Sequence, residues 1–269
     1  MPIIDAHAHI YPQKIAERAV GGIGDMYNYS AMYGKGTAEH LIGCTADTPI
    51  THFLVHSVAT TARSVPHIND FLAQEQHDHR QFVAFGTMHQ DFADKEAEVD
   101  RALGLGLHGF KLHPDTQRVN MDDPRLMEFY EIIAGRAPLV VHTGDYRYDY
   151  SSPKRLLRIL KTFPDLVVDA AHMGGWSQFD RGYDTLHDIA HASDRVFVDA
   201  SSTVHFTGVR HLRELIDMWG TDRVMFGSDY PMWNPGGELK QLRACGLSED
   251  DWEKITWHNA ERFTGVTIE

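Results

Sequence analysis

Short runs of Val, Ile, Leu and Phe recur along the chain, and longer segments of mixed polarity separate them. Runs of this kind, bounded by turn residues, are typical of buried strands. Most of them begin roughly 25 to 30 residues apart, the length of one strand–helix unit. The predicted strands are Ile3–Ile10, His52–Val58, Phe82–Met88, Gly109–Pro114, Leu139–Gly144, Val167–Met173, Val196–Ser202 and Val224–Pro231.

The segments between these runs carry apolar residues at helical spacing and end in helix-stop residues. Helices are predicted over Asp94–Leu105, Arg125–Gly135 and Lys154–Phe163, and Ser248 is predicted to cap the last helix. The segment Val20–Gly36 lacks this pattern and is predicted to be a long loop over one end of the fold.

Eight strand–helix units without a shift in composition predict an α/β fold, a (β/α)₈ TIM barrel formed as a single domain over residues 1–269. The alternative is an open doubly wound sheet. That fold usually carries a glycine-rich phosphate loop after its first strand, where this chain has His-Ala-His-Ile-Tyr-Pro. The barrel is therefore the preferred interpretation.

Charge and composition limit the kinds of partner that the protein is expected to bind. The formal net charge is −13 and no cluster of Lys or Arg occurs, which excludes nucleic acid and an anionic membrane surface as expected partners. No apolar run is long enough to cross a membrane, and the N-terminal residues do not resemble a signal peptide. Two isolated cysteines, Cys44 and Cys245, suit a reducing compartment, so a cytoplasmic location is expected.

Polar residues stand at the ends of several predicted strands, where barrel enzymes carry their active sites. Alternation along the first strand predicts that Asp5, His7 and His9 point into the barrel, with Ile4 and Ala6 facing the helices. Two imidazoles on the same face of a strand can share a metal ion, although a lone His-x-His pair is weak evidence.

Three further strand ends strengthen the prediction. His142 ends the fifth strand, His172 the sixth and Asp229 the eighth. Desolvated imidazoles and carboxylates need partners, and this donor set suits Zn²⁺, Mn²⁺ or Fe²⁺. The alternative is that one or two of these histidines are hydrogen-bonded core residues. All five together predict a divalent metal site.

The motifs HAH, HTG, AHMGG and GSDYP, on the first, fifth, sixth and eighth strands, resemble those of the amidohydrolase superfamily. The similarity covers nearly the whole chain and is closest to the compact amidohydrolase-related branch, which includes metal-dependent decarboxylases and lactone hydrolases. It implies a distorted barrel with His7, His9, His142 and Asp229 as metal ligands. It also implies that His172 is a further ligand or the catalytic acid/base.

The fourth strand leaves the number of metal ions open. Lys111 and His113 alternate onto one face. In binuclear members of the superfamily a carboxylated lysine on this strand bridges two metals. Otherwise Lys111 is a buried cation that supports the site, with Asp5 as a candidate partner. One essential ion is expected, Zn²⁺ with Mn²⁺ or Fe²⁺ as alternatives, and a second only if Lys111 is carboxylated. His113 is expected to contact substrate or metal.

This donor set favours hydrolysis of an amide, ester or lactone bond of a small molecule by a metal-activated water. Asp229 would accept the proton of the water, and His172 would polarise the substrate carbonyl or deliver a proton to the leaving group. The alternative is nonoxidative decarboxylation of a small aromatic or unsaturated carboxylic acid. A remoter alternative is a noncatalytic metal-binding protein.

Loop residues near the strand ends are candidates for substrate binding. Arg147 could clamp a substrate carboxylate, or pair with Asp145 or Asp149 and fix its own loop. The other candidates are Tyr146, His205, Trp176 and Trp233. Barrels of this family often form homodimers, and no stripe in this sequence identifies an interface.

Overall fold

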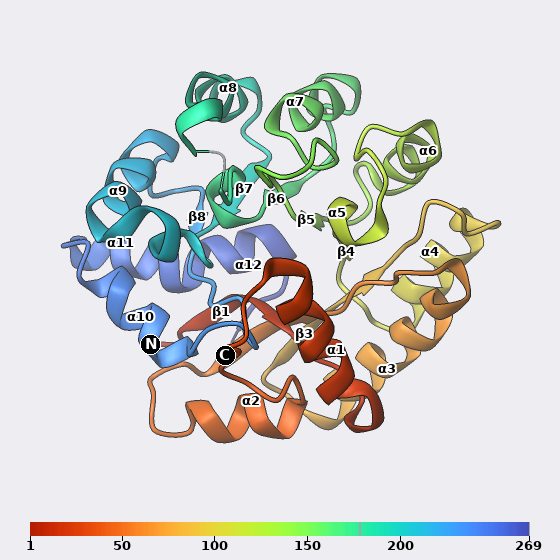
Figure 1. Ribbon diagram of the computed structural model, residues 1–269, viewed down its shortest axis with the longest axis horizontal. Helices are drawn as coiled ribbons and strands as arrows, with labels where there is room; N and C mark the ends of the chain where they lie inside the picture. The colour runs from red at the N-terminus through yellow and green to blue at the C-terminus, as the bar shows by residue number, and fades with distance from the viewer. Residues whose placement is uncertain (178, 269) are drawn as a thin grey trace.

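Eight parallel strands follow one another around the molecule in chain order, and helices surround them (Figure 1). The structure is a computed structural model that describes residues 1–177 and 179–268. The strands are β1 (Ile4–His9), β2 (His52–His56), β3 (Phe82–Thr87), β4 (Phe110–Leu112), β5 (Leu139–Val141), β6 (Val168–Ala170), β7 (Val196–Asp199) and β8 (Val224–Met225). All eight predicted strands are confirmed. Several end earlier than predicted, since the residues that follow turn into loops at the barrel mouth.

The strands close into a nearly complete barrel. Neighbours pair in parallel register, as where Phe110 lies opposite Leu139. A single bridge between Ala8 and Tyr230 joins the first strand to the segment after the last one. The amide of Asp229 also donates to the carbonyl of His7 at 2.8 Å. The predicted single-domain (β/α)₈ barrel is therefore confirmed.

Helices cover the outside of the barrel. The α-helices are α1 (Gln13–Tyr27), α2 (Ala38–Thr45), α3 (Val65–Asp78), α4 (Lys95–Gly104), α5 (Pro114–Gln117), α6 (Pro124–Ile133), α7 (Pro153–Thr162), α8 (Phe179–Ala192), α9 (Thr203–Trp219), α10 (Pro235–Arg243), α11 (Glu249–Glu253) and α12 (Asn259–Thr264). Three short segments, η1 (Ala62–Ser64), η2 (His172–Gly174) and the π-helical η3 (Lys254–His258), complete the set. No helix among the described residues is long and apolar enough to cross a membrane.

The predicted helices are confirmed, and their caps explain their starts. The side chains of Asp94 and Asp123 accept backbone N–H groups in the first turns of α4 and α6. Ser248 accepts the amide of Asp251 at 3.1 Å at the start of α11. The predicted loop Val20–Gly36 is wrong in its first half, because α1 continues to Tyr27 and only the residues after it are irregular.

The inner face of β1 also differs from the prediction. Its register against β2 shifts between Asp5 and Ala8, which marks a β-bulge. Ile4, before the bulge, and Ala6, within it, belong to a hydrophobic cluster with Phe85 and Phe263, not to the cluster packed against the outer helices. Asp5 accepts the backbone amides of His7 and Ser228 beside the bulge. The bulge resets the alternation, so that His7 and His9 still reach the site.

The second cluster fills the barrel below the mouth. Phe85 stacks on Phe263 of α12 at 5.7 Å between ring centroids, and Phe197 lies 5.5 Å from the same ring. Burial of one such side chain stabilises the fold by about 1.5–3 kcal/mol. The barrel interior is therefore a packed core, and the polar residues above it face one open end.

Candidate metal centre

Five polar residues converge at this open end. His7 and His9 end β1, while His142, His172 and Asp229 follow β5, β6 and β8. Nε2 of His7 and Nε2 of His9 each lie 3.7 Å from Oδ1 of Asp229. Nδ1 of His142 lies 3.0 Å from Nε2 of His172. The structure thus brings together all five residues predicted from the sequence.

The backbone at the mouth is strained. His172, Ser202 and Asp229 have positive φ angles of 61°, 59° and 58°, a region that side chains with a Cβ rarely adopt. Conformations of this kind persist where the surrounding structure imposes them, and they cluster at functional sites. The left-handed turns aim these side chains at one another across the barrel.

The donor set fits a divalent ion. His7, His172 and Asp229 each offer an atom within 4.8 Å of the other two, and so do His7, His9 and His56. Several buried donor atoms have no hydrogen-bond partner, among them Nδ1 of His9 and Nε2 of His142. Orphaned buried polar atoms are costly, and imidazole with carboxylate suits Zn²⁺, Mn²⁺ or Fe²⁺. His142 itself groups with His113 and Asp115, so it lies at the edge of the cluster.

The electrostatics favour neutral imidazoles. Burial lowers the pKa of His7, His9 and His142 well below the ordinary value, and neighbouring cationic or imidazole groups add to the effect. Burial also lowers the pKa of His172, which Asp229 partly offsets. Burial raises the pKa of Asp229, opposed by His172 and by the hydrogen bond from Ser202. Neutral imidazole is the form that binds metal ions.

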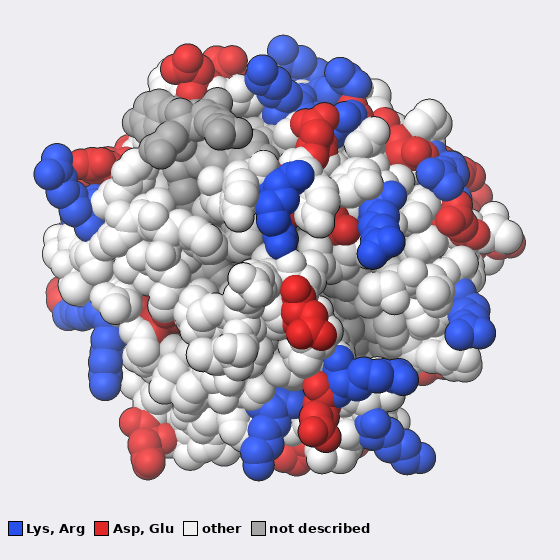
Figure 2. All heavy atoms as spheres, in the orientation of Figure 1, with Lys and Arg blue, Asp and Glu red and all other residues white. Residues whose placement is uncertain are grey.

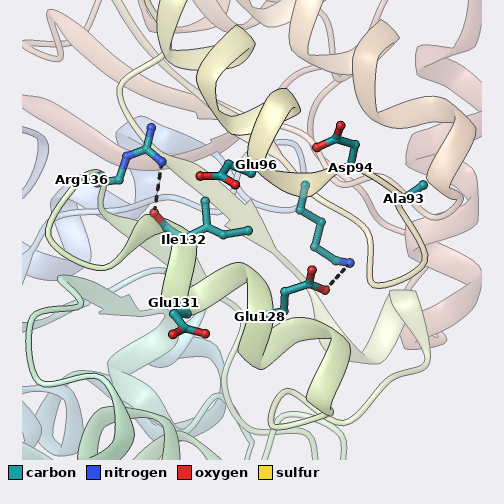
Figure 3. A pocket seen from close by; sticks show the side chains of 8 residues that line it. Ala93, Asp94, Glu96, Glu128, Glu131, Ile132 and Arg136 are labelled. Carbon is teal, nitrogen blue, oxygen red and sulfur yellow. Dashed lines mark hydrogen bonds and ion pairs between the residues drawn. The ribbon is translucent and has the colours of Figure 1, made fainter.

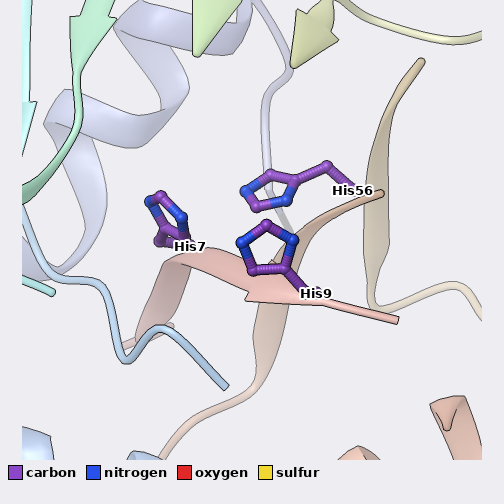
Figure 4. A group of neighbouring side chains, drawn as sticks. All are labelled: His7, His9 and His56. Carbon is purple, nitrogen blue, oxygen red and sulfur yellow. The ribbon is translucent and has the colours of Figure 1, made fainter. Parts of the chain in front are cut away.

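His56 is a member of this cluster that was not counted among the metal ligands predicted from the sequence. It ends β2, is fully buried, and has no partner for either ring nitrogen. Its ring lies 4.7 Å from His7 and 4.4 Å from His9, centroid to centroid, in edge-to-face contacts (Figure 4). Its place at a strand end was visible in the sequence, but its orientation depends on the register between β1 and β2.

Asp199, at the end of β7, supports the centre from below and was also missed. Its Oδ2 lies 2.8 Å from Nδ1 of His7, which directs Nε2 of that ring toward Asp229. Its Oδ1 accepts the backbone amide of Ser201 at 3.0 Å. A carboxylate closing an otherwise apolar strand, Val196–Asp199, was the available signal.

Lys111 is buried beside the same ring, with Nζ 3.2 Å from Nε2 of His7. Burial lowers its pKa to about 8, against the attraction of Asp199, Asp229 and Asp169. Among the described residues it forms no ion pair with Asp5, so that suggested partner was wrong. Carboxylation of Lys111, and with it a second metal ion, stays a prediction.

His113 lies at the rim. Its ring stacks on His142 at 3.9 Å between centroids, and Nε2 lies 2.8 Å from the hydroxyl of Tyr27 on α1. The contact ties the helix over the mouth to the centre. A role of His113 in substrate or metal binding stays a prediction.

The candidate substrate residues have different surroundings. Arg147 forms a bidentate pair with Asp145, donates to the carbonyl of Met26 and lies over the ring of Tyr27 at 5.0 Å. Its guanidinium therefore fixes the loop and α1, as the alternative interpretation held. Tyr146 is 62% exposed.

Trp233 and His205 form a supporting pair. Their rings stack at 3.4 Å between centroids, and Nε1 of Trp233 donates to Oγ of Ser202 at 2.8 Å. Oγ of Ser202 in turn donates to Oδ2 of Asp229 at 2.5 Å. Roles for these two residues in binding substrate stay predictions.

A cavity of about 920 Å³ opens above the centre. His9, His142, His172 and Asp229 lie on its floor, and its walls include Tyr11, Met26, Tyr27, Trp176, Pro231 and Met232. Of the five loop residues suggested for substrate binding, Trp176 is the one among its described lining side chains, and His113 lines it too. A separate hollow of about 480 Å³ lies between α4 and α6, where Lys95 pairs with Glu128 at 3.0 Å (Figure 3). This second hollow is lined by residues of α4, of α6 and of the segments next to them, and not by the strand-end residues of the metal centre.

Known structures share this architecture. A 2,6-dihydroxybenzoate decarboxylase complexed with 2,6-dihydroxybenzoate is 17% identical, with a TM-score of 0.75 over 99% of this chain and 100% of that one. A 5-carboxyvanillate decarboxylase from Sphingomonas paucimobilis is 19% identical, with a TM-score of 0.73 over 99% of both chains. A dihydroxybenzoic acid decarboxylase from Polaromonas sp. JS666 with bound manganese and 2-nitroresorcinol is 16% identical, with a TM-score of 0.74 over 100% of this chain and 98% of that one.

At these identities the likeness shows the fold. A family model described as Amidohydrolase matches residues 4–266, which is nearly the whole chain. The strand-end histidines and aspartate, the barrel around them and this match agree, and the chain belongs to the amidohydrolase family.

Proposed function

We propose that the protein is a metal-dependent nonoxidative decarboxylase of a small aromatic or unsaturated carboxylic acid. The observation that carries the proposal is the placement of His172. Its Nδ1 lies 2.8 Å from Oγ of Ser201, and the residue lines the cavity beside Asp229. An imidazole held in this way can deliver a proton to a carbon atom above it.

The surroundings of Asp229 disfavour hydrolysis, which the sequence alone had favoured. In a hydrolase this carboxylate would accept the proton of a water molecule. Here Oδ2 accepts the hydroxyl of Ser202, while Oδ1 faces His7 and His9. The carboxylate is better placed to hold a metal ion than to act as a base.

The cavity supports an aromatic substrate. Tyr27 and Trp176 line it together with Met26 and Met232. Side chains of this kind bind a flat ring and keep water away from it. The similar structures described above are decarboxylases of aromatic acids, one of them with bound manganese, which supports the same class of substrate and favours Mn²⁺ alongside Zn²⁺.

His7, His9 and Asp229, with His142 at the edge, would hold the ion. A bound divalent ion supplies charge neutralisation and polarises a substrate oxygen. The chain itself supplies the proton: the bond between ring carbon and carboxyl carbon breaks, CO₂ leaves, and the electron pair left on the ring carbon takes a proton from the protonated ring of His172. Asp229 and Asp199 favour that protonated form by raising the pKa against the effect of burial, and a proton from solvent restores it after each turnover. Ser201 keeps the imidazole oriented throughout.

The test is a comparison of CO₂ release with acid release by the manganese-loaded protein. 2,6-Dihydroxybenzoate, 5-carboxyvanillate and a panel of lactones and esters are the compounds to supply. We expect CO₂ from an aromatic acid and, in D₂O, deuterium at the carbon that lost it. His172→Asn should slow this release by about 100-fold or more, whereas His77→Asn, an exposed change on α3 away from the cavity, should not.

Hydrolysis of a lactone or ester without CO₂ release from any acid would contradict the proposal and restore the hydrolase. No reaction with any compound, from a protein that binds manganese, would favour a noncatalytic metal-binding protein.

A further inference from the structure

Three arginines surround the entrance of the cavity that holds the metal centre. Arg18 lies on α1, Arg63 on η1 and Arg118 directly after α5, and all three are exposed and line the cavity. We refer to them as the rim arginines. They come from three different connections of the barrel, so no local sequence feature places them together.

The rim arginines form no ion pair or hydrogen bond with any residue that the structure describes. Arg181 lies outside the side chains that the structure describes; of the other arginines, all but Arg80 form ion pairs or hydrogen bonds. Arg80 does not line the cavity. The only described carboxylates in the lining are Asp115 and Asp229, which lie with the histidines. Three of the four arginines described without a partner therefore line one cavity, whose described carboxylates lie with the histidines.

The fold fixes the place of Arg118 at the rim. It is the C-cap of α5, with a left-handed backbone (φ 54°), as Asn28 is the C-cap of α1. Its side chain therefore starts from a fixed helix end beside the cavity.

The charge of the rim opposes that of the chain. The net charge is −13, and on the face shown in Figure 2 positive and negative groups are interspersed, near the middle as well as toward the outline. Guanidinium groups bind carboxylate and phosphate in bidentate geometry, and unpaired ones at an opening attract anions. The rim is therefore suited to an anionic group that stays near the solvent.

We propose that the substrate carries a second anionic group, a carboxylate or a phosphate, at the end remote from the reacting carboxylate, and that the rim arginines bind it. This rests on the proposed function in one respect: the reacting carboxylate occupies the floor beside His172. The exposed rim arginines would then bind a second anionic group of the same substrate. The substrate class is an aromatic or unsaturated acid with at least two negative charges.

Equilibrium binding to the manganese-loaded protein tests this without any turnover. The probes are matched pairs that differ in the remote group: terephthalate against 4-methylbenzoate, and biphenyl-4,4′-dicarboxylate against 4′-methylbiphenyl-4-carboxylate. 4-Phosphonobenzoate distinguishes phosphate-like from carboxylate recognition. We expect at least one dianion to bind about 10- to 100-fold more tightly than its monoanion.

The variants assign the preference to the rim. Arg18→Gln, Arg63→Gln and Arg118→Gln combined should abolish the preference for the dianion and leave binding of the monoanion within about twofold. Arg63→Gln alone should reduce the preference partly, and Arg80→Gln, the matched unpaired arginine, should not change it. Thermal unfolding checks that each variant is folded.

Equal binding of both members of every pair, or a preference that survives the combined change, overturns the proposal. So does a failure of all dianions to bind. Because the readout is binding alone, a dianion preference without CO₂ release would contradict the proposed reaction and leave the rim inference standing.

Discussion

Asp229 is held from both sides of its carboxyl group. Its Oδ1 faces His7 and His9, and its Oδ2 accepts the hydroxyl of Ser202, which itself accepts Nε1 of Trp233. Ligands that are oriented by outer hydrogen bonds bind metals more tightly, and loss of such a partner typically costs 10- to 100-fold in affinity.

We therefore expect Ser202→Ala to raise the dissociation constant for Mn²⁺ about tenfold or more, measured by titration calorimetry. Ser193→Ala removes a hydroxyl that accepts only the amide of Arg195, in the turn before β7. It should leave the affinity unchanged. An unchanged affinity for Ser202→Ala would mean that Ser202 does not orient the ligand.

His56 allows a pH-dependent test. Burial lowers its pKa well below the usual value, so in the metal-free protein the unfolded state binds a proton that the native state does not. Its contribution to stability is complete above the unfolded pKa of about 6.5 and decreases as the pH falls below it. Asp5, whose pKa burial raises to about 7, has the opposite effect, so a single variant is more informative than the total curve.

The difference in unfolding free energy between wild type and His56→Asn should change by about 1.4 kcal/mol per pH unit below pH 6.5. Urea unfolding of the metal-free proteins at several pH values measures it. His67→Asn, exposed on α3, is the control. A difference that is independent of pH would show that His56 is not buried in its neutral form.

At the scale of elements, α1 is fastened over the mouth by a few contacts. Arg147 donates to the carbonyl of Met26 and lies over Tyr27, and the hydroxyl of Tyr27 reaches His113. The helix also carries Gly21, Gly22 and Gly24, which weaken it in isolation. Its order therefore depends on these tertiary contacts.

Arg147→Gln should release the C-terminal half of α1. We expect faster amide hydrogen exchange over residues 20–27 with little change in the midpoint of thermal unfolding, because the barrel core is untouched. Arg136→Gln, which removes a surface pair with Asp100, should not alter exchange there. Unchanged exchange in Arg147→Gln would show that the contacts of Arg147 with Met26 and Tyr27 do not order the helix.

Helix α1 also shows a limit of prediction from the sequence. The eight strands could be predicted because each is a compact apolar run, and the strand-end positions of His7, His9, His142, His172 and Asp229 followed from them. The three glycines of α1 argued for a loop, yet Gly24 is needed because a Cβ there would lie 2.6 Å from the carbonyl oxygen of Tyr29. That contact exists only after folding.

The bulge in β1 and the partners of the centre were hidden for a related reason. The alternating sequence Ile-Asp-Ala-His-Ala-His is compatible with an unbroken strand, and only the pairing of β1 with β2 reveals the shift at Asp5. Asp199 and Ser202 act through His7 and Asp229, which are far from them in the chain. Single-residue patterns do not contain such pairings.

For the whole molecule, metal removal should cost stability. Without an ion, buried atoms such as Nε2 of His142 have no hydrogen-bond partner among the described residues. A ligand that binds only the native state stabilises it by about 2.7 kcal/mol at one hundred times its dissociation constant. We expect chelation to lower the midpoint of thermal unfolding and Mn²⁺ to restore it.

None of the rim arginines is a predicted metal ligand. Chelation should therefore lower the unfolding midpoint of Arg18→Gln as much as that of the wild type. It should hardly change the midpoint of His9→Asn. Equal unfolding midpoints of the wild type with and without Mn²⁺ would contradict a native metal site.

The barrel is closed where the segment after β8 meets β1, at the bridge between Ala8 and Tyr230, and Asp229 faces His7 and His9 across this closure. Asp229 is 220 positions after His9. At a synthesis rate of roughly 5–20 residues per second, the ribosome reaches it about 10 to 45 s after the histidines. Until then the nascent protein exposes imidazoles without their carboxylate, and acquisition of the ion belongs to the last stage of its biogenesis.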